Sequence, residues 1–338
     1  MTEKVAIITP CFNRAHTLRE TAESVLGQTH QNWEWLLVDD GSSDGSWELI
    51  QSLCSRDERI KGIQRKDHPK GANSCRNIGA DRASADWLIF LDSDDLLGEH
   101  CLRQRLSFIQ EKTMDSVYYF PTVIFKDSPD EGRLWDDSDH PMPWLESVLL
   151  GVPPCQSTGP FWHRSQWNQY GGWTPNLHVW QDLDLHARAH WKGAKFISAE
   201  GCTPDVFHRV SDDSISRVGF HSKEKLESRL LVIEECWNRM QQRGASESER
   251  KAMVAMTMSA VKNGANLGLF SEMKAMLAKP QFMLDRAESA RAQGILRSRR
   301  WKLDRIPQVR RQIQRQWNET LPSSGRKLGR HRWTPQSS

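Results

Sequence analysis

The chain has 338 residues, of which 38% are hydrophobic, and its formal net charge is +3. It is long enough for a sizeable core and one or two domains, and its charge as a whole does not favour a nucleic-acid partner. Its seven cysteines are scattered without a C-x-x-C pair, which indicates reduced thiols in the cytosol. No apolar run approaches the roughly 20 residues that span a bilayer, and no signal peptide precedes the first strand-like segment. We therefore expect a cytoplasmic protein, soluble or peripheral to a membrane.

The first hundred residues alternate between short apolar runs and segments with helical periodicity. Strands are expected at 5–8, 35–38, 60–63 and 87–91, and helices at 18–26, 47–54 and 71–83. Pro10 is expected to end the first strand and Asn13 to cap the following helix. Gly79, inside the third helix, indicates close packing. This alternation predicts a parallel, doubly wound sheet.

Polar residues follow three of the expected strands: Thr9 the first, Asp39 the second, and the run Asp92–Asp95 the fourth. Right-handed crossovers place these ends on one edge of the sheet, where open α/β sheets bind ligands. Crowded carboxylates repel one another unless a cation or a proton relieves them. Their hard oxygen atoms suit Mg²⁺ or Mn²⁺, which would hold substrate phosphates. A solvated turn is the alternative for the acidic run alone.

Nucleotide-binding motifs of other classes are missing from the sequence. No G-x-G-x-x-G follows the first strand, and no G-x-x-x-x-G-K-[ST] occurs anywhere in the chain. Dinucleotide-binding and P-loop proteins are therefore disfavoured. A nucleotide held by aspartate side chains and a metal ion remains.

Five blocks, in this order, resemble the family 2 glycosyltransferases, which have the GT-A fold. The blocks are Thr9-Pro10-x-Phe12-Asn13-Arg14, Ser24-Val25-Leu26-x-Gln28-Thr29, Val38-Asp39-Asp40-Gly41-Ser42-x-Asp44, Gly71-x-x-x-Cys75-Arg76-Asn77-x-Gly79 and Phe90-Leu91-Asp92-Ser93-Asp94-Asp95. The similarity weakens afterwards, reaches about residue 217, and does not cover the last third. It implies an α/β GT-A (Rossmann-like) fold with a mostly parallel sheet flanked by helices, followed here by a C-terminal helical extension.

The resemblance implies a role for each matching residue on the donor side. Thr9 and Asp39 would contact the base of a nucleotide-sugar, commonly uridine. Asp92 would reach the ribose or the metal, and Asp94 would bind the Mn²⁺ or Mg²⁺ that bridges the diphosphate. Arg76 would lie near the diphosphate or the base.

Three further residues of these blocks have less defined roles. Asp44 and Asp95 are either direct contacts or cap and turn residues. Arg14 is interpreted as structural.

The segment Trp180–Arg188 resembles the family pattern Glu-Asp-x-Asp at the start of a helix, where the second residue usually serves as the catalytic base. Asp182 occupies that place, and Gln181 stands where Glu is common. The chemistry needs such a carboxylate, because an acceptor hydroxyl has too high a pKa to attack well at neutral pH. The alternative for Asp182 is a carboxylate that the helix dipole stabilises.

The similarity ends at Phe207–Ser216, which resembles the family's Y-R-x-H-x-x-S-I-S segment. Aligning Arg209 and Ser214 puts His208 in the Tyr place and Ser211 in the His place. Some GT-A enzymes use a His here as a metal ligand. His208 is therefore either a substitute metal ligand, beside Asp94 and Asp92, or a structural residue.

The last third is expected to be helical, and beyond Arg286 it becomes strongly basic with interspersed apolar residues. A basic amphipathic segment over 286–332 can lie on an anionic bilayer, here the cytoplasmic face of the inner membrane. A solvated helix pair is the alternative, and no motif supports nucleic-acid binding.

We divide the chain into a GT-A domain over 1–220 and a helical extension over 221–322, with a disordered tail over 323–338. The GT-A domain comprises a nucleotide-sugar half (1–97) and an acceptor half (98–220).

The expected function is metal-dependent, inverting transfer of a sugar from a nucleotide-sugar, a UDP-sugar above all, to a hydroxyl of a glycan or lipid-linked acceptor. Polysaccharide synthesis at the cell surface is the expected process. One alternative is a sugar-1-phosphate nucleotidyltransferase, which would need a Gly/Arg/Lys-rich loop after the first strand. The other is a non-catalytic glycan- or membrane-binding module with a decayed site.

Overall fold

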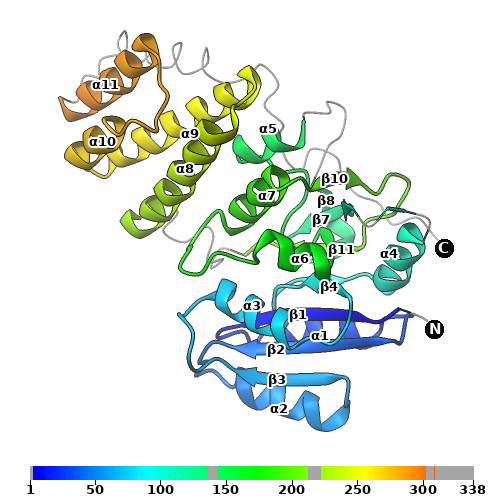
Figure 1. Cartoon of the computed structure of the whole chain (residues 1–338). Coiled ribbons are helices and arrows are strands. Elements are labelled where there is room, and N and C mark those ends of the chain that lie inside the picture. The colour runs from blue at the N-terminus through cyan, green and yellow to red at the C-terminus, as the bar shows by residue number, and fades with distance from the viewer. Residues whose placement is uncertain are drawn as a thin grey trace.

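The computed structural model describes residues 3–110, 112–113, 115–135, 143–211, 222–301 and 308. Its first part alternates strands and helices, as the periodicity predicts (Figure 1). The elements are β1 (Val5–Cys11), α1 (Leu18–Leu26), β2 (Trp33–Asp39), α2 (Ser46–Arg56), β3 (Ile60–Gln64), α3 (Ala72–Arg82) and β4 (Trp87–Phe90).

The middle of the chain adds shorter elements. They are β5 (Leu96–Leu97), α4 (Cys101–Ile109), β6 (Ser116–Tyr119), β7 (Thr122–Phe125), η1 (Pro129–Glu131), β8 (Arg133–Leu134), α5 (Trp144–Leu149), β9 (Pro160–His163), α6 (Arg164–Tyr170), α7 (Gln181–Trp191), β10 (Lys195–Ser198) and β11 (Val206–Arg209).

The central sheet has seven strands in the order β10-β6-β9-β4-β1-β2-β3. Strand β9 runs antiparallel to both of its neighbours, and every other neighbouring pair is parallel. The predicted α/β fold with a largely parallel sheet flanked by helices is therefore confirmed. A second sheet, β5-β11-β7-β8, pairs β11 with β5 just after the acidic run.

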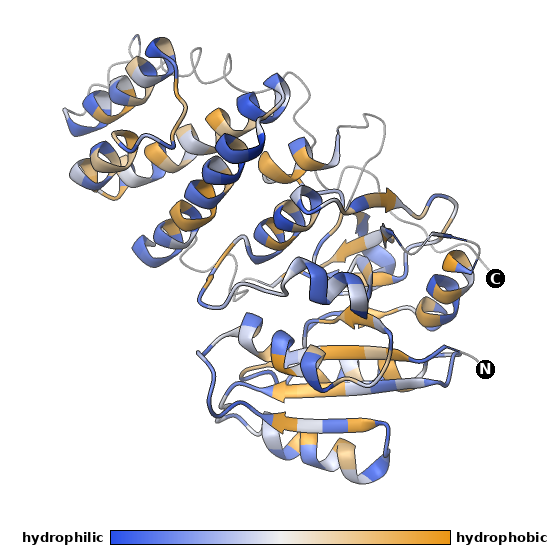
Figure 2. Cartoon of the chain, in the orientation of Figure 1, coloured by the Kyte–Doolittle hydropathy of each residue, from blue (hydrophilic) through white to orange (hydrophobic). Residues whose placement is uncertain are grey.

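Alternate residues of the central strands serve two separate cores. Val5 and Ile7 pack with α1, α2 and α4, whereas Ala6 and Ile8 pack with α3, α6 and α7. Strands β1 and β2 are buried along their whole length, and Figure 2 shows them largely in the apolar colour. Strands covered on both faces need such continuous apolar runs.

The expectation that Pro10 ends the first strand is wrong. Strand β1 continues to Cys11, and Pro10 pairs in register with Val38 of β2. The carbonyl of Ile8 accepts a hydrogen bond from Leu91 on the β4 side, so Pro10, two residues on, has its nitrogen on that side too. Pairing with β4 stops at Phe90. Pro10 therefore removes no hydrogen bond from the ladder.

Asn13 does not cap the following helix, whose N-cap is Thr17. Asn13 instead has a φ of 53° and its Oδ1 accepts a hydrogen bond from the backbone N–H of Ser43 at 2.9 Å. Its amide thus joins the loops that follow β1 and β2. A short polar side chain that tolerates the left-handed region suits either task, so the local pattern did not distinguish them.

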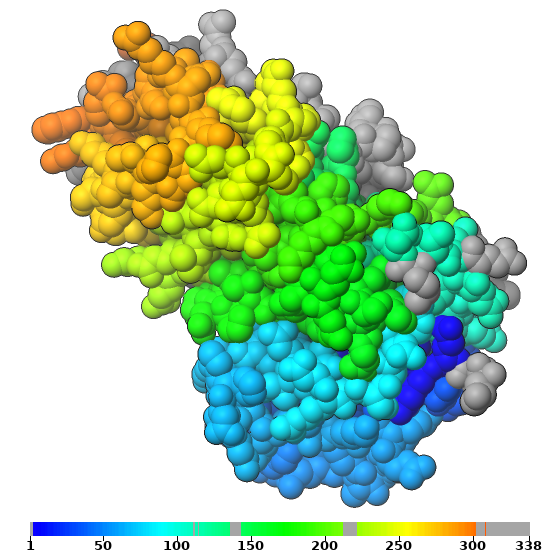
Figure 3. Space-filling model, viewed as in Figure 1, coloured from blue at the N-terminus to red at the C-terminus, as the bar shows by residue number. Residues whose placement is uncertain are grey.

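The chain ends in α8 (Lys223–Arg243), α9 (Glu247–Asn266), α10 (Phe270–Leu277) and α11 (Arg286–Arg300). These helices lie at the opposite end of the molecule from α2 and β3 (Figures 1 and 3). They share one apolar core with α5 and α7, so the helices are joined to the acceptor half by burial and not by a linker alone.

Within the described residues, no helix is both long and apolar enough to cross a membrane. The predicted tail over 323–338, most of the basic segment after Trp301, and Ser214–Ser216 lie outside the described residues.

Candidate active site

A cleft of about 590 Å³ opens at the carboxyl ends of β1 and β4. One side is charged and is lined by residues of the predicted donor half, among them Arg76, Asp92 and Asp94. The other side carries Asp182 and the loop before α7. The structure thus brings together residues that the sequence places about a hundred positions apart.

Arg76 connects the two sides of this cleft. Its Nη2 donates to Asp92 Oδ1 at 2.6 Å and its Nη1 donates to Gln181 Oε1 at 3.3 Å. The guanidinium also lies over the ring of Trp173, with 4.7 Å between its carbon and the ring centroid. Arg76 is buried, which makes this cation a fixed part of the cleft wall.

Asp94 carries negative charge that its surroundings compensate poorly. Burial, together with the carboxylates of Asp95 and Asp92, raises the pKa of Asp94 to about 7. Arg14 only partly offsets this, with its Nε 3.5 Å from Asp94 Oδ2. A carboxylate in this state favours any cation that enters the cleft.

Asp95 is fully buried and holds the segment of β11. It accepts hydrogen bonds from His208 Nδ1 at 2.9 Å and from the backbone N–H of Arg209 at 2.8 Å. Burial opposes the charged imidazole, but Asp95, Asp92 and Asp94 outweigh it and raise the pKa of His208 to about 9. Asp95 is thus a positioning residue for His208, which lines the cleft.

Thr9 and Asp39 do not line the cleft. Thr9 is buried, and its hydroxyl accepts a hydrogen bond from Trp35 Nε1 at 2.9 Å. Asp39 is also buried, and its Oδ2 accepts from the backbone N–H groups of Gly41 at 3.0 Å and Ser42 at 3.2 Å. Both side chains hold the strand ends in shape, and their contact with a nucleobase stays a prediction.

Asp44 makes the contacts of a cap residue, which was one of the two roles that the sequence left open for it. Its Oδ1 accepts from the backbone N–H of Ser46 at 3.0 Å, and its Oδ2 accepts from that of Ala15 at 3.0 Å. Asp44 therefore joins the start of α2 to the loop after β1.

Asp182 lies in the first turn of α7 and faces the same cleft as Arg76 and Asp92. Its Oδ1 accepts from the backbone N–H of Leu183 at 2.9 Å. Burial raises the pKa of Asp182, with a further contribution from Asp92, against the opposing effect of Arg76. A carboxylate made more basic in this way is a better proton acceptor.

The residues near Asp94 fit a hard divalent cation in their chemistry. No group of three or more His, Cys, Asp or Glu side chains in the described residues is arranged to hold a metal ion by itself. Mg²⁺ and Mn²⁺, however, commonly take one or two carboxylates and leave the other positions to substrate phosphates and water. Asp94, with excess negative charge, is suited to that type of site, with Asp92 and His208 beside it.

Several lining residues were not expected from the sequence. Lys70 adds a cation, with its Nζ 4.0 Å from the ring centroid of Phe12. Trp135 meets His208 edge-on at 5.7 Å and donates its indole N–H to Pro153 O at 2.8 Å. Lys70 and Trp135 lie in loops without local periodicity, so nothing in the sequence distinguished them from surface residues.

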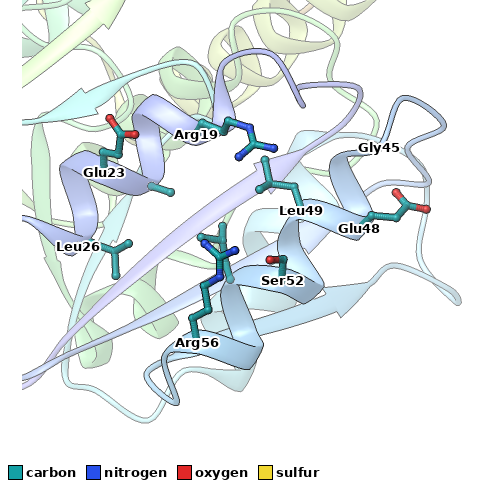
Figure 4. A pocket seen from close by; sticks show the side chains of 10 residues that line it. Arg19, Glu23, Leu26, Gly45, Glu48, Leu49, Ser52 and Arg56 are labelled. Carbon is teal, nitrogen blue, oxygen red and sulfur yellow. The ribbon is translucent and has the colours of Figure 1, made fainter.

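A second cavity, of about 410 Å³, lies between α1 and α2 (Figure 4). Leucines and Ala22 line it, with Arg19 and Arg56 turned toward its middle. None of the predicted catalytic or donor-binding residues lines this cavity.

Comparisons with known proteins agree with this geometry. Residues 6–172 match the family model described as glycosyl transferase family 2. A glycosyltransferase of Rickettsia bellii is 35% identical over 148 residues, which are 44% of this chain and 19% of that protein. The chain therefore spans about a fifth of that longer relative.

The alignments with two further relatives cover a larger share of those proteins. TuaG of Bacillus subtilis, named as a teichuronic acid biosynthesis glycosyltransferase, is 37% identical over 220 residues, or 63% of this chain and 81% of TuaG. WfgD of Escherichia coli, named UDP-Glc:alpha-D-GlcNAc-diphosphoundecaprenol beta-1,3-glucosyltransferase, is 37% identical over 114 residues, or 34% of this chain and 44% of WfgD.

Solved structures show the same fold at low sequence identity. TarS 1–349 of S. aureus, in complex with UDP-GlcNAc, superposes with a TM-score of 0.56 at 13% identity over 88% of this chain and 92% of that chain. The mannosyltransferase PcManGT of Pyrobaculum calidifontis, with GDP-Man and Mn²⁺, has a TM-score of 0.51 at 13% identity. The superposition covers 95% of this chain and 86% of that chain. The chain belongs to glycosyl transferase family 2, a family of glycosyltransferases, and has the GT-A fold.

Proposed function

We propose that the chain transfers a sugar from a UDP-sugar to a hydroxyl of a glycan or lipid-linked acceptor, with inversion at the anomeric carbon. The observation that carries this proposal is that Asp182 and the Arg76–Asp92 pair line one cleft, joined by the hydrogen bond from Arg76 to Gln181. A carboxylate with a raised pKa and a fixed cation therefore line one cleft of ligand size.

In this proposal Asp182 accepts the proton of the acceptor hydroxyl as its oxygen attacks the anomeric carbon. Arg76 and Lys70 bind the diphosphate of the donor and orient it for departure. Asp94 and Asp92 would hold Mn²⁺ or Mg²⁺, and His208 could join them only after it loses the proton that its raised pKa retains. The bound metal would neutralise charge on the leaving group. Asp182 removes a proton and forms no bond to the sugar, so the reaction is one displacement with inversion.

The relatives support the choice of substrates. WfgD is named for a UDP-Glc donor and a diphosphoundecaprenol-linked acceptor, and TuaG for the synthesis of a polymer of the cell surface. The TarS structure contains UDP-GlcNAc. The charged half of the cleft in this chain suits a nucleoside diphosphate of the same kind.

A lipid-linked acceptor requires the protein to reach a membrane surface, and α11 is suited to that contact. Arg286, Arg297 and Arg300 are exposed on it, and Trp301 at its end is 69% exposed. Glu288, an acid on the same helix, is buried and accepts from Arg250 Nη1 at 3.0 Å. The helix therefore presents positive charge and an indole, which together favour the interface of an anionic bilayer at the cytoplasmic face.

Donor hydrolysis tests the catalytic proposal directly. The protein is incubated with a panel of nucleotide-sugars and Mn²⁺ or Mg²⁺, and release of nucleoside diphosphate is followed with and without EDTA. We expect release from one UDP-sugar, lost with EDTA and in Asp94→Ala. Asp81→Ala, which removes an exposed carboxylate from α3, is the matched control and should keep the activity.

The same protein samples distinguish the proposed transferase from the two alternative functions. No hydrolysis, together with no metal-dependent binding of UDP by calorimetry, would contradict the proposal and favour the non-catalytic module. Formation of a nucleotide-sugar from a sugar 1-phosphate and a nucleoside triphosphate would favour the nucleotidyltransferase.

A further inference from the structure

The loop before α7 lines the cleft with five consecutive residues, 176–180. Leu177 and Val179 are 6% and 5% exposed and belong to buried cores. Asn176, His178 and Trp180 lie between or beside them in sequence, and all three line the cleft. Asn176, His178 and Trp180 therefore offer a ligand more surface than Leu177 and Val179, which line the cleft as well.

Trp180 is held there in an unusual backbone conformation. Its φ of 60° and ψ of 30° are in the left-handed region, which bulky residues rarely adopt. The surroundings determine this conformation on both sides of the residue. His178 N–H donates to Ser228 Oγ at 3.0 Å, Gln181 Nε2 donates to Leu177 O at 2.9 Å, and Asp184 N–H donates to Trp180 O at 2.9 Å.

Backbone strain of this kind collects at ligand sites because it fixes a side chain in one place. Trp180 is two residues before Asp182 and lines the same cleft as this predicted base. The lining residues on this side, 156–157 and 176–181, include no Asp, Glu, Lys or Arg among those described. Apart from Asp182, the charged lining residues belong to the donor half and to β11. Arg229, which does not line the cleft, has its guanidinium carbon 5.8 Å from the centroid of the Trp180 ring.

We propose that Trp180 is the platform on which the acceptor binds, and that the acceptor residue is a neutral saccharide. This inference rests on the proposed transferase function and adds the class of acceptor to it. The flat indole covers the apolar C–H face of a pyranose, which leaves the hydroxyls at the ring edge for polar neighbours such as His178. A stacked ring presents one of its hydroxyls to Asp182 in a fixed orientation.

The test compares Trp180→Asn with Trp180→Phe. Asparagine tolerates the left-handed backbone but removes the ring, whereas phenylalanine keeps a ring at the same place. Binding is measured by saturation-transfer NMR in the presence of UDP, with octyl β-D-glucopyranoside and octyl N-acetyl-β-D-glucosaminide as neutral probes and octyl β-D-glucuronide as a charged one. Donor hydrolysis and the melting temperature are measured on the same samples.

We expect the neutral probes to bind the wild type and Trp180→Phe, and their dissociation constants to rise about two- to tenfold in Trp180→Asn, the range of an aromatic contact. Donor hydrolysis by the wild type tests the transferase function separately, and the melting temperature shows whether each variant is folded. Equal binding by Trp180→Asn, no binding of the neutral probes to the wild type, or preference for the glucuronide would overturn the inference while hydrolysis still supports the transferase.

Discussion

At the scale of single residues, Asp182 shows how burial can make a carboxylate reactive. Its neighbours are an arginine, Arg76, and a carboxylate, Asp92, which act on its pKa in opposite directions, and burial decides the balance upward. Gln181 contributes no charge of its own but accepts a hydrogen bond from Arg76. Gln181 thus ties the start of α7, which carries the proposed base, to Arg76.

Asp182→Asn should lower the rate of sugar transfer by about 10²–10⁴, the range for a general base, without loss of UDP binding. The base works only when ionised, so wild-type transfer should fall as pH falls through the raised pKa of Asp182. In Gln181→Glu a new carboxylate raises this pKa further, and the acid limb of the pH–rate profile should move to higher pH. An unchanged profile would contradict the assignment of Asp182.

His186 is a second residue whose surroundings determine its pKa. It is fully buried beside Trp144, Trp162 and Phe196, and neither ring nitrogen has a hydrogen-bond partner in the described part of the chain. Burial lowers the pKa of His186 to about 3, and Arg188 contributes to the shift. The folded protein therefore holds this imidazole neutral.

A pH-dependent loss of stability follows from His186. Between about pH 6.5 and pH 3 the unfolded chain binds a proton at this residue that the folded chain does not bind. Stability should fall with falling pH in this window, by up to about 1.4 kcal/mol per pH unit from His186 alone. Urea unfolding of wild type and His186→Leu at pH 5 and pH 7.5 measures it. The variant should lose less stability on acidification, and an equal loss would contradict the account.

At the scale of elements, the packing of α3 on β1 depends on Gly79. A Cβ at this position would lie 2.4 Å from Ile8 Cγ2, inside the distance that packed atoms allow. The predicted close approach at Gly79 is therefore confirmed. It matters for the site because α3 carries Arg76 and β1 leads into the loop with Arg14.

Gly79→Ala should destabilise the protein, by about 1–3 kcal/mol as for other overpacked cores, although alanine has the higher helix propensity. The matched control is Gly294→Ala in α11, where a Cβ would meet nothing within 4 Å. That change should stabilise the protein by roughly 0.5–1 kcal/mol. Chemical unfolding measures the change in the free energy of unfolding for both variants. If both substitutions stabilised the protein, helix propensity would outweigh packing at Gly79.

At the scale of the whole molecule, the C-terminal helices extend the cleft-bearing domain. The helix α8 supports the acceptor side of the cleft through Ser228, which accepts from the loop before α7. At the far end of the same region, α11 presents the basic surface for which we propose a membrane contact. One helical region thus contacts the loop that carries Trp180 and, in our proposal, would also meet a bilayer.

Binding to vesicles should report this surface. We expect the protein to sediment with vesicles that contain anionic lipid, less so at high salt, and little with neutral vesicles. Arg297→Glu combined with Arg300→Glu should weaken the binding, whereas exchange of the exposed Leu231 for Ala on α8 should not. If the charge variant sedimented with anionic vesicles as well as the wild type does, α11 would not be the membrane contact.

Much of the fold and part of the site follow from contiguous sequence. The strand and helix order, the acidic run after β4 and the helix that begins at Gln181 are encoded in neighbouring residues, because strands and helices have short periods and motifs are local. Asp92 and Asp94 stand out as an acidic run after a strand, and Asp182 was named from the resemblance to the family pattern; their roles stay predictions. Pro10 and Asn13 were misjudged, because their roles depend on which strand or loop lies beside them.

The sequence by itself determined the family, the order of the elements and the acidic groups that end the strands. Only the tertiary structure decided which partner each of those groups has. Asp95 and His208 are 113 positions apart, and Arg76 and Gln181 are 105 apart, yet each pair is hydrogen-bonded. Contacts over such separations depend on the packing of strands and helices into one sheet and its covering layers. A local pattern contains no information on that packing, which also sets the burial that shifts each pKa.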